Sequence, residues 1–275
     1  MPYNPLDVIC EILGQPASQM TNPVNADYQC PFCNSKCIKR SQRLEGPFPV
    51  CMVYRNHKLS DKTIKEPVIV CPKRFYEADL FKDVIKHAWI DYNPSNPKFV
   101  HEIRMGEVGN VDFVVVDVGI TDSRPEIRNF ISVELQAVDI TGTYEPAYSS
   151  IVLSKPLESK PIYNFNYANV RKRFITQLIS KGFFHHHWET KIVAIVQDII
   201  YDNIKQAIKF SDAKIEESNI LFMQYQLVKT NGEYHLQFKD ITGTTHSNLM
   251  MGALYAQVPS KEDFCKRILS QLSRN

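Results

Sequence analysis

The sequence lacks the features that mark secreted and membrane proteins. Its 275 residues contain no apolar run near the roughly 18 residues that a membrane-spanning helix needs. The first ten residues, MPYNPLDVIC, carry no basic stretch leading into an apolar segment. The 32 Lys and Arg residues nearly balance 30 Asp and Glu, so any nucleic-acid-binding face must be local. We therefore expect a cytoplasmic globular protein.

Cysteine is scarce outside one segment of the chain. Cys10 and Cys265 stand apart, while the other five of the seven cysteines crowd into one stretch. These five are Cys30, Cys33, Cys37, Cys51 and Cys71. An odd and clustered set does not suit the disulfide framework of a secreted protein, and in a reducing cytosol it indicates a metal site. A tetrahedral site takes four ligands, so one cysteine is surplus, and C-x-x-C spacing alone favours Cys30 and Cys33.

Apolar patterning predicts two regions, an N-terminal region over 1–72 with the cysteine metal site and a mixed α/β domain over 73–275. In the first region we expect a short N-terminal helix and small strands at VCMVY and PVIVC. In the second region we expect a helix beginning near Pro72, followed by strands over 111–120 and 130–140 that a polar turn over 122–128 joins. A helix over 166–184, which Gly182 would stop, and a strand over 191–200 come next. The chain then continues with a helix from about 204, a hairpin at Asn231 and Gly232, and a C-terminal helix. This order favours a mixed central sheet.

Three polar residues interrupt the two predicted central strands. Asp112 enters the first strand, and Glu134 and Gln136 share one face of the second, because strand side chains alternate with a period of two. Polar side chains in an apolar strand are costly unless something pairs with them. Two carboxylates that converge can hold a hard divalent cation, which polarises a phosphate and activates water. The pattern alone suits a site for metal-assisted phosphodiester hydrolysis, and it equally suits two structural acids, with Asp112 capping a strand and Glu134 exposed on an edge strand.

These residues carry a resemblance to a known family. Asp112 followed by Glu134-Leu135-Gln136 resembles the PD-(D/E)xK nuclease signature, with Gln in place of the usual Lys, a variant of the NotI-type restriction enzymes. The string VELQAVDITGTY over 133–144 and the basic helix over 169–174 are similar to the segments of those enzymes. The resemblance implies a restriction-endonuclease-like core, with Asp112 and Glu134 as Mg²⁺ ligands and Gln136 orienting water or phosphate.

The resemblance also implies an acidic residue upstream of the first strand. Glu107 is the best positional match and Glu102 is its competitor, and the shorter loop of this chain leaves the choice open.

The cysteine segment resembles the same family. NotI-type enzymes show a C-P-F string, a Cys followed two residues later by Lys, a Cys in a small strand, and C-P-x-R. The matches here are Cys30-Pro31-Phe32, Cys37 with Lys39, Cys51 in VCMVY, and Cys71-Pro72-Lys73-Arg74. The resemblance therefore assigns Cys30, Cys37, Cys51 and Cys71 as ligands, although Cys33 stays open as an alternative to Cys37. Sulfur ligation suits iron or zinc, the family implies a single iron atom, and a fully thiolate-bound metal is structural.

The function implied is a Mg²⁺-dependent type II restriction endonuclease that cuts double-stranded DNA at a palindromic, GC-rich site. A two-fold site is matched by a homodimer in which each subunit cuts one strand. One alternative is a repair or CRISPR-associated nuclease of the same fold with an iron–sulfur cluster, and another is a non-catalytic, metal-stabilised DNA-binding protein. Two roles are possible for a set of basic residues: they could bind DNA phosphates, or they could be solvated surface charges. These residues are Lys36, Lys39, Arg40, Arg43 and Arg171 to Arg173. No role follows for His185 to His187 beyond a helix-terminal or groove-lining patch.

Overall fold

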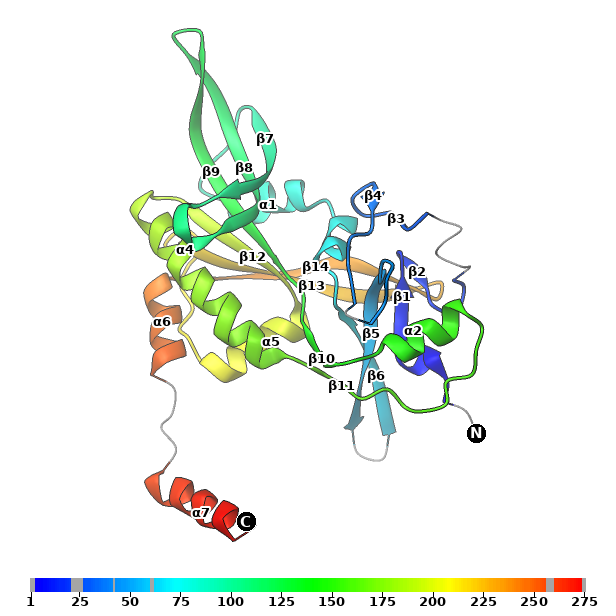
Figure 1. The fold of residues 1–275 in the computed structure, drawn as a ribbon. Helices are drawn as coiled ribbons and strands as arrows, with labels where there is room; N and C mark the ends of the chain where they lie inside the picture. The colour runs from blue at the N-terminus through cyan, green and yellow to red at the C-terminus, as the bar shows by residue number, and fades with distance from the viewer. Residues whose placement is uncertain (1–2, 21–26, 42, 60–61, 256–259, 274–275) are drawn as a thin grey trace.

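A six-strand mixed sheet forms the centre of the computed structural model, which describes residues 3–20, 27–41, 43–59, 62–255 and 260–273 (Figure 1). The strands are β7 (Pro97–Arg104), β8 (Asn110–Thr121), β9 (Arg124–Gln136), β12 (Lys191–Gln197), β13 (Ile220–Thr230) and β14 (Glu233–Thr244). Their order is β14-β13-β12-β9-β8-β7, and β12 runs parallel to both β9 and β13. All seven residues of β12 are buried, as in a parallel strand covered on both faces. The predicted mixed sheet is confirmed.

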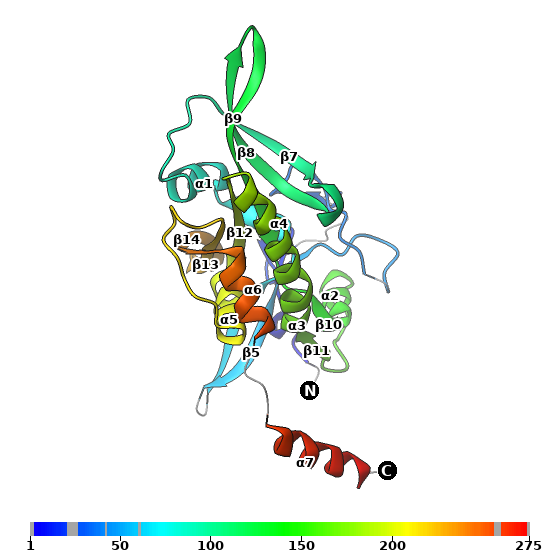
Figure 2. The same cartoon turned by 90° about the vertical axis from the view of Figure 1, so that its left-hand side faces the viewer.

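Helices cover both faces of this sheet (Figures 1 and 2). One face carries η2 (Pro72–Glu77) and α1 (Leu80–Ala88), and the other carries α4 (Ile175–His187), α5 (Asp198–Ile208) and α6 (His246–Leu254). Alternate residues of β12 serve the two layers: Val193 and Ile195 join the cluster of α1, while Ile192 and Ala194 join the cluster of the other three helices. The period of two along the strand thus builds two separate apolar layers.

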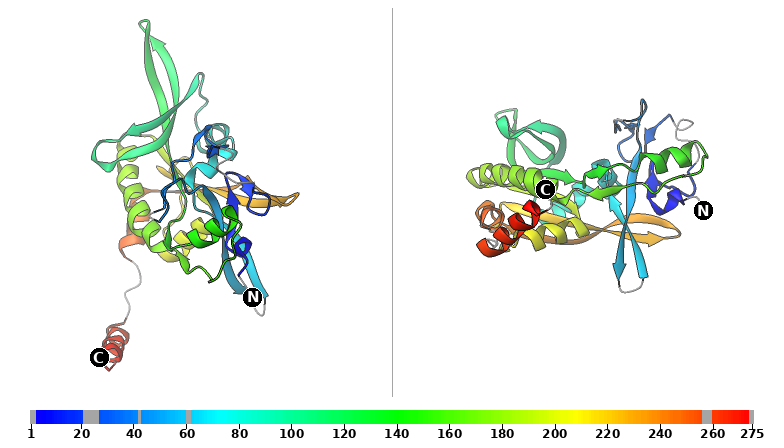
Figure 3. Two further views of the ribbon diagram at one scale, coloured as in Figure 1. Left: turned by 45° about the vertical axis from the view of Figure 1, so that its right-hand side comes forward. Right: turned by 60° about the horizontal axis from the view of Figure 1, so that its bottom comes forward.

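A second, four-stranded sheet of order β2-β1-β5-β6 belongs to the N-terminal region (Figure 3). Its strands are β1 (Ile9–Ile12), β2 (Gln15–Pro16), β5 (Val50–Leu59) and β6 (Lys62–Ile69), with η1 (Pro5–Asp7) before them and the hairpin of β3 (Gln29–Cys30) and β4 (Ser35–Lys36) between. A later segment with β10 (Ile140–Gly142), α2 (Glu145–Val152) and β11 (Tyr163–Phe165) packs on this region. Tyr163 Oη donates to Tyr54 O over 2.6 Å, so residues on both sides of the predicted boundary at 72 interlock.

Most of the predicted elements are present, with three corrections. Some bounds also shift: the strands expected over 130–140 and 191–200 end at Gln136 and Gln197, and the helix expected from about 204 begins at Asp198 as α5. The strands at VCMVY and PVIVC, the hairpin at Asn231 and Gly232, and the C-terminal helix α7 (Lys261–Leu272) are confirmed. The N-terminal helix is wrong, because the apolar run over 9–12 forms the fully buried strand β1 against β5. The polar segment over 122–128 is not a long turn: only Asp122 and Ser123 turn, and β8 and β9 continue as a two-stranded arm (Figure 1).

The third correction concerns Gly182, which does not end a helix. The predicted helix begins with α3 (Tyr167–Asn169), passes through the π-helical turn η4 (Val170–Phe174), and continues in α4 to His187. A Cβ at Gly182 would lie 2.5 Å from Ile220 Cδ1, so this glycine lets the helix approach β13. In the part of the chain that the structure describes, no helix is long and apolar enough to cross a membrane.

Candidate active site

Asp112 and Glu134 face each other across the hydrogen-bonded pair of β8 and β9. The antiparallel register pairs Phe113 with Val133, which sets Asp112 opposite Glu134. Directly opposed residues share a face of the sheet, here the face covered by α4. Leu135 N donates to Asp112 Oδ2 over 2.7 Å and holds that carboxylate at the end of the ladder. The structure therefore brings together the two acids that the strand pattern singles out.

A lysine absent from the sequence-based site completes this arrangement. Lys181 of α4 has a side chain only 3% exposed, and its ammonium forms an ion pair with Glu134 and donates to Asn110 O over 2.6 Å. Leu178 and His185, one turn to either side, are buried too. A lysine on the apolar face of a predicted helix was therefore the signal that could have revealed it.

The electrostatics of the pair favour a bound cation. Burial raises the pKa of Glu134 to about 7, against the opposing effect of Lys181, and the charge of Asp112 raises it further. Burial also raises the pKa of Asp112, while Leu135 N–H and the charges of Lys73 and Lys181 lower it. A divalent cation between two such carboxylates would favour their ionised forms. The residues present thus fit a hard metal ion.

The two candidates for the upstream acid lie in different places. Glu102 sits on β7 between the pairs His101–Phe113 and Ile103–Val111, across from Asp112, and its charge contributes to the raised pKa of Asp112. Glu107 is exposed in the short helix η3 (Gly106–Val108), which contacts α4. Glu102 is exposed and has a positive φ, and among the described residues no three acidic side chains are placed to hold a metal ion, so the role of either acid stays a prediction.

Gln136 lies one strand repeat beyond Glu134, on the same face. It lines a cavity of about 250 Å³ together with Asp139, Asn169, Arg173 and Gln177. Asn169 Nδ2 donates to Asp139 Oδ2 over 2.6 Å, which ties the start of the helix to the end of β9. The π-helical turn η4, a feature that is common at functional sites, carries Arg173. A polar cavity with one guanidinium thus adjoins the carboxylates.

Lys39, for which a phosphate clamp and a solvated surface charge were both open, is engaged within the protein. Its ammonium donates to Val50 O (2.7 Å), Val70 O (3.1 Å) and Tyr144 Oη (3.2 Å), which uses all three of its N–H groups. Lys39 therefore joins β5, the residue that follows β6 and the segment after β9. Its contacts are those of a structural residue.

The five clustered cysteines lie in one corner of the molecule but do not close a metal site. Their thiols affect one another in pairs: Cys30 with Cys33, Cys37 with Cys33 and with Cys71, and Cys51 with Cys71. Burial raises the pKa of Cys30 to about 11 and raises the pKa values of Cys37 and Cys51 as well. Among the described residues, no three Cys, His, Asp or Glu side chains are placed to hold a metal ion.

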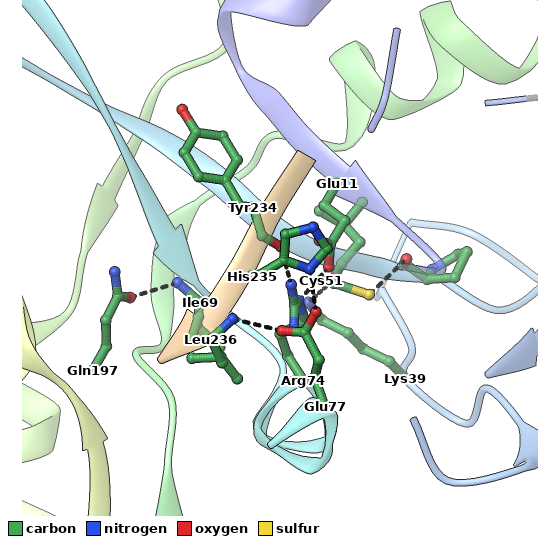
Figure 4. A network of polar contacts seen from close by, with 12 residues as sticks. Glu11, Lys39, Cys51, Ile69, Arg74, Glu77, Gln197, Tyr234, His235 and Leu236 are labelled. Atoms are coloured by element: carbon green, nitrogen blue, oxygen red, sulfur yellow. Dashed lines mark hydrogen bonds and ion pairs between the residues drawn. The ribbon is translucent and has the colours of Figure 1, made fainter. Parts of the chain in front are cut away.

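The arginine of the C-P-K-R string is buried in a polar network between the two sheets (Figure 4). Arg74 is 1% exposed, forms an ion pair with Glu11 (Nε to Oε1, 2.7 Å), and donates hydrogen bonds to Glu77 Oε2 (2.5 Å) and Tyr234 O (2.6 Å). Glu77 Oε2 also accepts from Leu236 N over 2.6 Å. The network joins β1, η2 and β14, and it anchors the turn that carries Lys73 toward Asp112.

A comparison with known families covers both the cysteine segment and the strands that carry Asp112 and Glu134. The family model described as restriction endonuclease NotI matches residues 12–237, a span that includes the cysteine segment and the strands of the carboxylate pair. A search of the curated proteins found no match. The span amounts to most of the 275 residues, and it agrees with the resemblance seen in the motifs. The chain therefore belongs to the NotI restriction endonuclease family, whose members cleave DNA.

Proposed function

We propose that this chain is a type II restriction endonuclease that hydrolyses phosphodiester bonds of double-stranded DNA in a Mg²⁺-dependent reaction. The observation that carries the proposal is the pair of half-buried carboxylates, Asp112 and Glu134, facing each other beside Lys181. The family match over 12–237 favours this function over a repair or CRISPR-associated nuclease of the same fold.

Each residue of the site has a distinct task in this reaction. Asp112 and Glu134 would hold Mg²⁺, which when bound supplies a Lewis acid for the phosphate and acidifies a water molecule. Gln136 offers a neutral amide that orients the water or a phosphate oxygen through hydrogen bonds. In the hydrolysis, the water oxygen bonds to phosphorus and one phosphorus–oxygen bond to a sugar breaks. The water loses its proton to solvent, and the departing oxygen takes one up.

The test combines a cleavage assay with one substitution in the site. Long duplex DNA of known sequence and high GC content is incubated with the protein and Mg²⁺, and the cut ends are mapped. We expect cutting at one sequence by the natural chain, and DNA binding without cutting by Glu134→Ala. Unchanged cleavage by this variant would exclude the site, and binding without cleavage by the natural chain would favour a non-catalytic DNA-binding protein.

A matched control is available on the same strand. Asp117 is a buried acid of β8 whose carboxylate accepts from Tyr92 Oη (2.6 Å) and Asn96 N (2.7 Å). It lies five residues from Asp112, roughly 17 Å along the strand. Asp117→Asn should therefore retain the cleavage that Glu134→Ala loses.

The specificity and assembly that we propose are a palindromic, GC-rich site and a homodimer. One active site hydrolyses one phosphodiester, so two copies related by a two-fold axis match a two-fold DNA site. The mapped ends give the sequence and overhang directly. Sedimentation of the protein with a short duplex of the mapped site should give two chains per duplex, and one chain per duplex would contradict the dimer.

We also propose that Cys30, Cys37, Cys51 and Cys71 hold one structural iron or zinc, with Cys33 as the alternative to Cys37. Thiolate sulfur is the donor that these metals share, and the pairwise influence among the thiols supports a common neighbourhood. The described arrangement does not bring three of them within ligand reach. Elemental analysis of protein purified without chelator should find about one atom per chain, and its absence would contradict the proposal.

A further inference from the structure

Lys181 is the buried cation of the carboxylate site. Its ammonium has three N–H donors, and within the described residues it meets two acceptors, Asn110 O and the Glu134 carboxylate. The neighbouring His185 cannot share the charge, because burial lowers its pKa to about 3 and it stays neutral. Gln136, on the same face as Glu134, carries a neutral amide. The positive charge that pairs with Glu134 therefore comes from the helix α4, while Lys73 of η2 adds positive charge near Asp112.

A lysine with only a structural role at this position would lower the stability of the fold more than an apolar residue would. Removing an ammonium from water costs several kcal/mol, and the apolar neighbours Leu178 and Ile175 show what otherwise fills this face of α4. Arg173 and Gln177 precede Lys181 on the same helix at intervals of four residues, and both line the cavity with Gln136. The helix thus carries a row of polar side chains along the end of β9.

We propose that Lys181 is a catalytic residue of this nuclease, whose ammonium contacts the scissile phosphate and stabilises the negative charge that develops on it during hydrolysis. This inference rests on the proposed function. The ammonium donates a hydrogen bond and transfers no proton, so the bonds formed and broken are those of phosphodiester hydrolysis alone. Preorganised donors directed at developing charge are among the largest contributions to enzyme catalysis.

The experiment compares the cleavage kinetics of four proteins on a short duplex that contains the mapped cut site. They are the natural chain, Lys181→Met, Lys181→Met combined with Gln136→Lys, and the control Lys191→Met. Lys181→Met should lower kcat by about 100- to 1,000-fold, the loss typical of one such donor, while KM changes little. Gln136→Lys added to this variant should restore part of kcat, because residue 136 lies on the same face about 7 Å along the strand from Glu134 and a lysine side chain spans that distance. If Lys181 only stabilised the fold, a lysine at position 136 would not restore kcat.

Lys191→Met is the matched control for loss of a buried lysine. Lys191 is 9% exposed and pairs with Asp91 over 3.0 Å near the start of β12, away from Glu134. We expect it to lower the unfolding temperature without changing kcat. If Lys181→Met does not fold, Lys181→Gln removes the charge while keeping a donor to Glu134, and the same rates are measured.

The outcomes separate this inference from the proposed function. Cleavage by the natural chain with an unchanged kcat for Lys181→Met overturns the role of Lys181 and leaves the nuclease proposal standing. A loss of kcat without rescue, in step with weaker DNA binding and stability, also overturns it in favour of a structural role. If the natural chain cuts no duplex, the proposed function itself fails and the role of Lys181 falls with it.

Discussion

Replacing Arg74 by Met should destabilise the protein more than most single substitutions. The change removes the partner of Glu11, whose side chain is only 3% exposed, together with the bond to Tyr234 O. Breaking a buried ion pair from one side costs about 3–5 kcal/mol, because the remaining charge is left uncompensated. For a chain of this length each kcal/mol lowers the unfolding temperature by roughly 2–4 °C. We therefore expect Arg74→Met to unfold about 6–20 °C below the natural protein.

The pH dependence of this loss follows from the protonation of Glu11. Burial raises its pKa to about 7, and the charge of Arg74 opposes that rise. Without Arg74 the pKa rises further, so the folded variant binds a proton more readily than the folded natural protein. Protonation removes the uncompensated charge, and the penalty should shrink from pH 8 to pH 6.

The assay is urea and thermal unfolding of four proteins, the natural chain, Arg74→Met, Glu11→Leu and the double variant. Replacing both partners by apolar side chains leaves no buried charge, so the double variant should recover most of the lost stability. Glu77 has other partners in Leu236 N and His235, so it does not require Arg74. A loss below about 1 kcal/mol at pH 8, or no coupling between residues 11 and 74 in the cycle, would refute this reasoning.

Three further predictions test the helix, the cysteines and the buried histidine. Gly182→Ala should lower the free energy of unfolding, measured in urea, by about 1–3 kcal/mol and should slow cleavage, because the added methyl overpacks the contact with β13. Gly46→Ala is the control, since the nearest atom to its new methyl would be 3.7 Å away. Equal stability of the two variants would contradict the contact between Gly182 and β13. Cys71→Ser should remove about one iron or zinc atom per chain while Cys265→Ser retains it, and equal metal content would exclude Cys71 as a ligand. Burial holds the pKa of His185 at about 3, below its value in the unfolded chain, so its contribution to stability is present above pH 6.5 and is lost as the pH falls. From pH 7 to pH 5 the free energy of unfolding of the natural protein should therefore fall by about 2 kcal/mol more than that of His185→Gln. An equal fall in both proteins would refute the neutral histidine.

Local patterns were sufficient to predict the strands that carry the carboxylates. Asp112, Glu134 and Gln136 follow from side-chain alternation, which is a property of the strand itself and needs no knowledge of its neighbours. The turn at Asn231 and Gly232 follows in the same way, because both residues adopt positive φ there. Family membership could be read from short strings because those strings are local as well.

The elements that were wrong depend on what packs against them. The run over 9–12 becomes a strand because β5 supplies its hydrogen bonds, and the apolar residues alone suit a helix equally well. Gly182 is a typical helix stop in sequence, yet the close approach of β13 gives it a different purpose.

The sequence by itself determined which side chains line the faces of the central strands, because that order repeats along a single segment. Only the tertiary structure decided what meets them. Lys181 reaches Glu134 from 47 residues away, and Arg74 reaches Tyr234 across 160. Such contacts arise when separate elements pack together, so a local pattern can mark a lysine on an apolar helix face but cannot say which acid it pairs with.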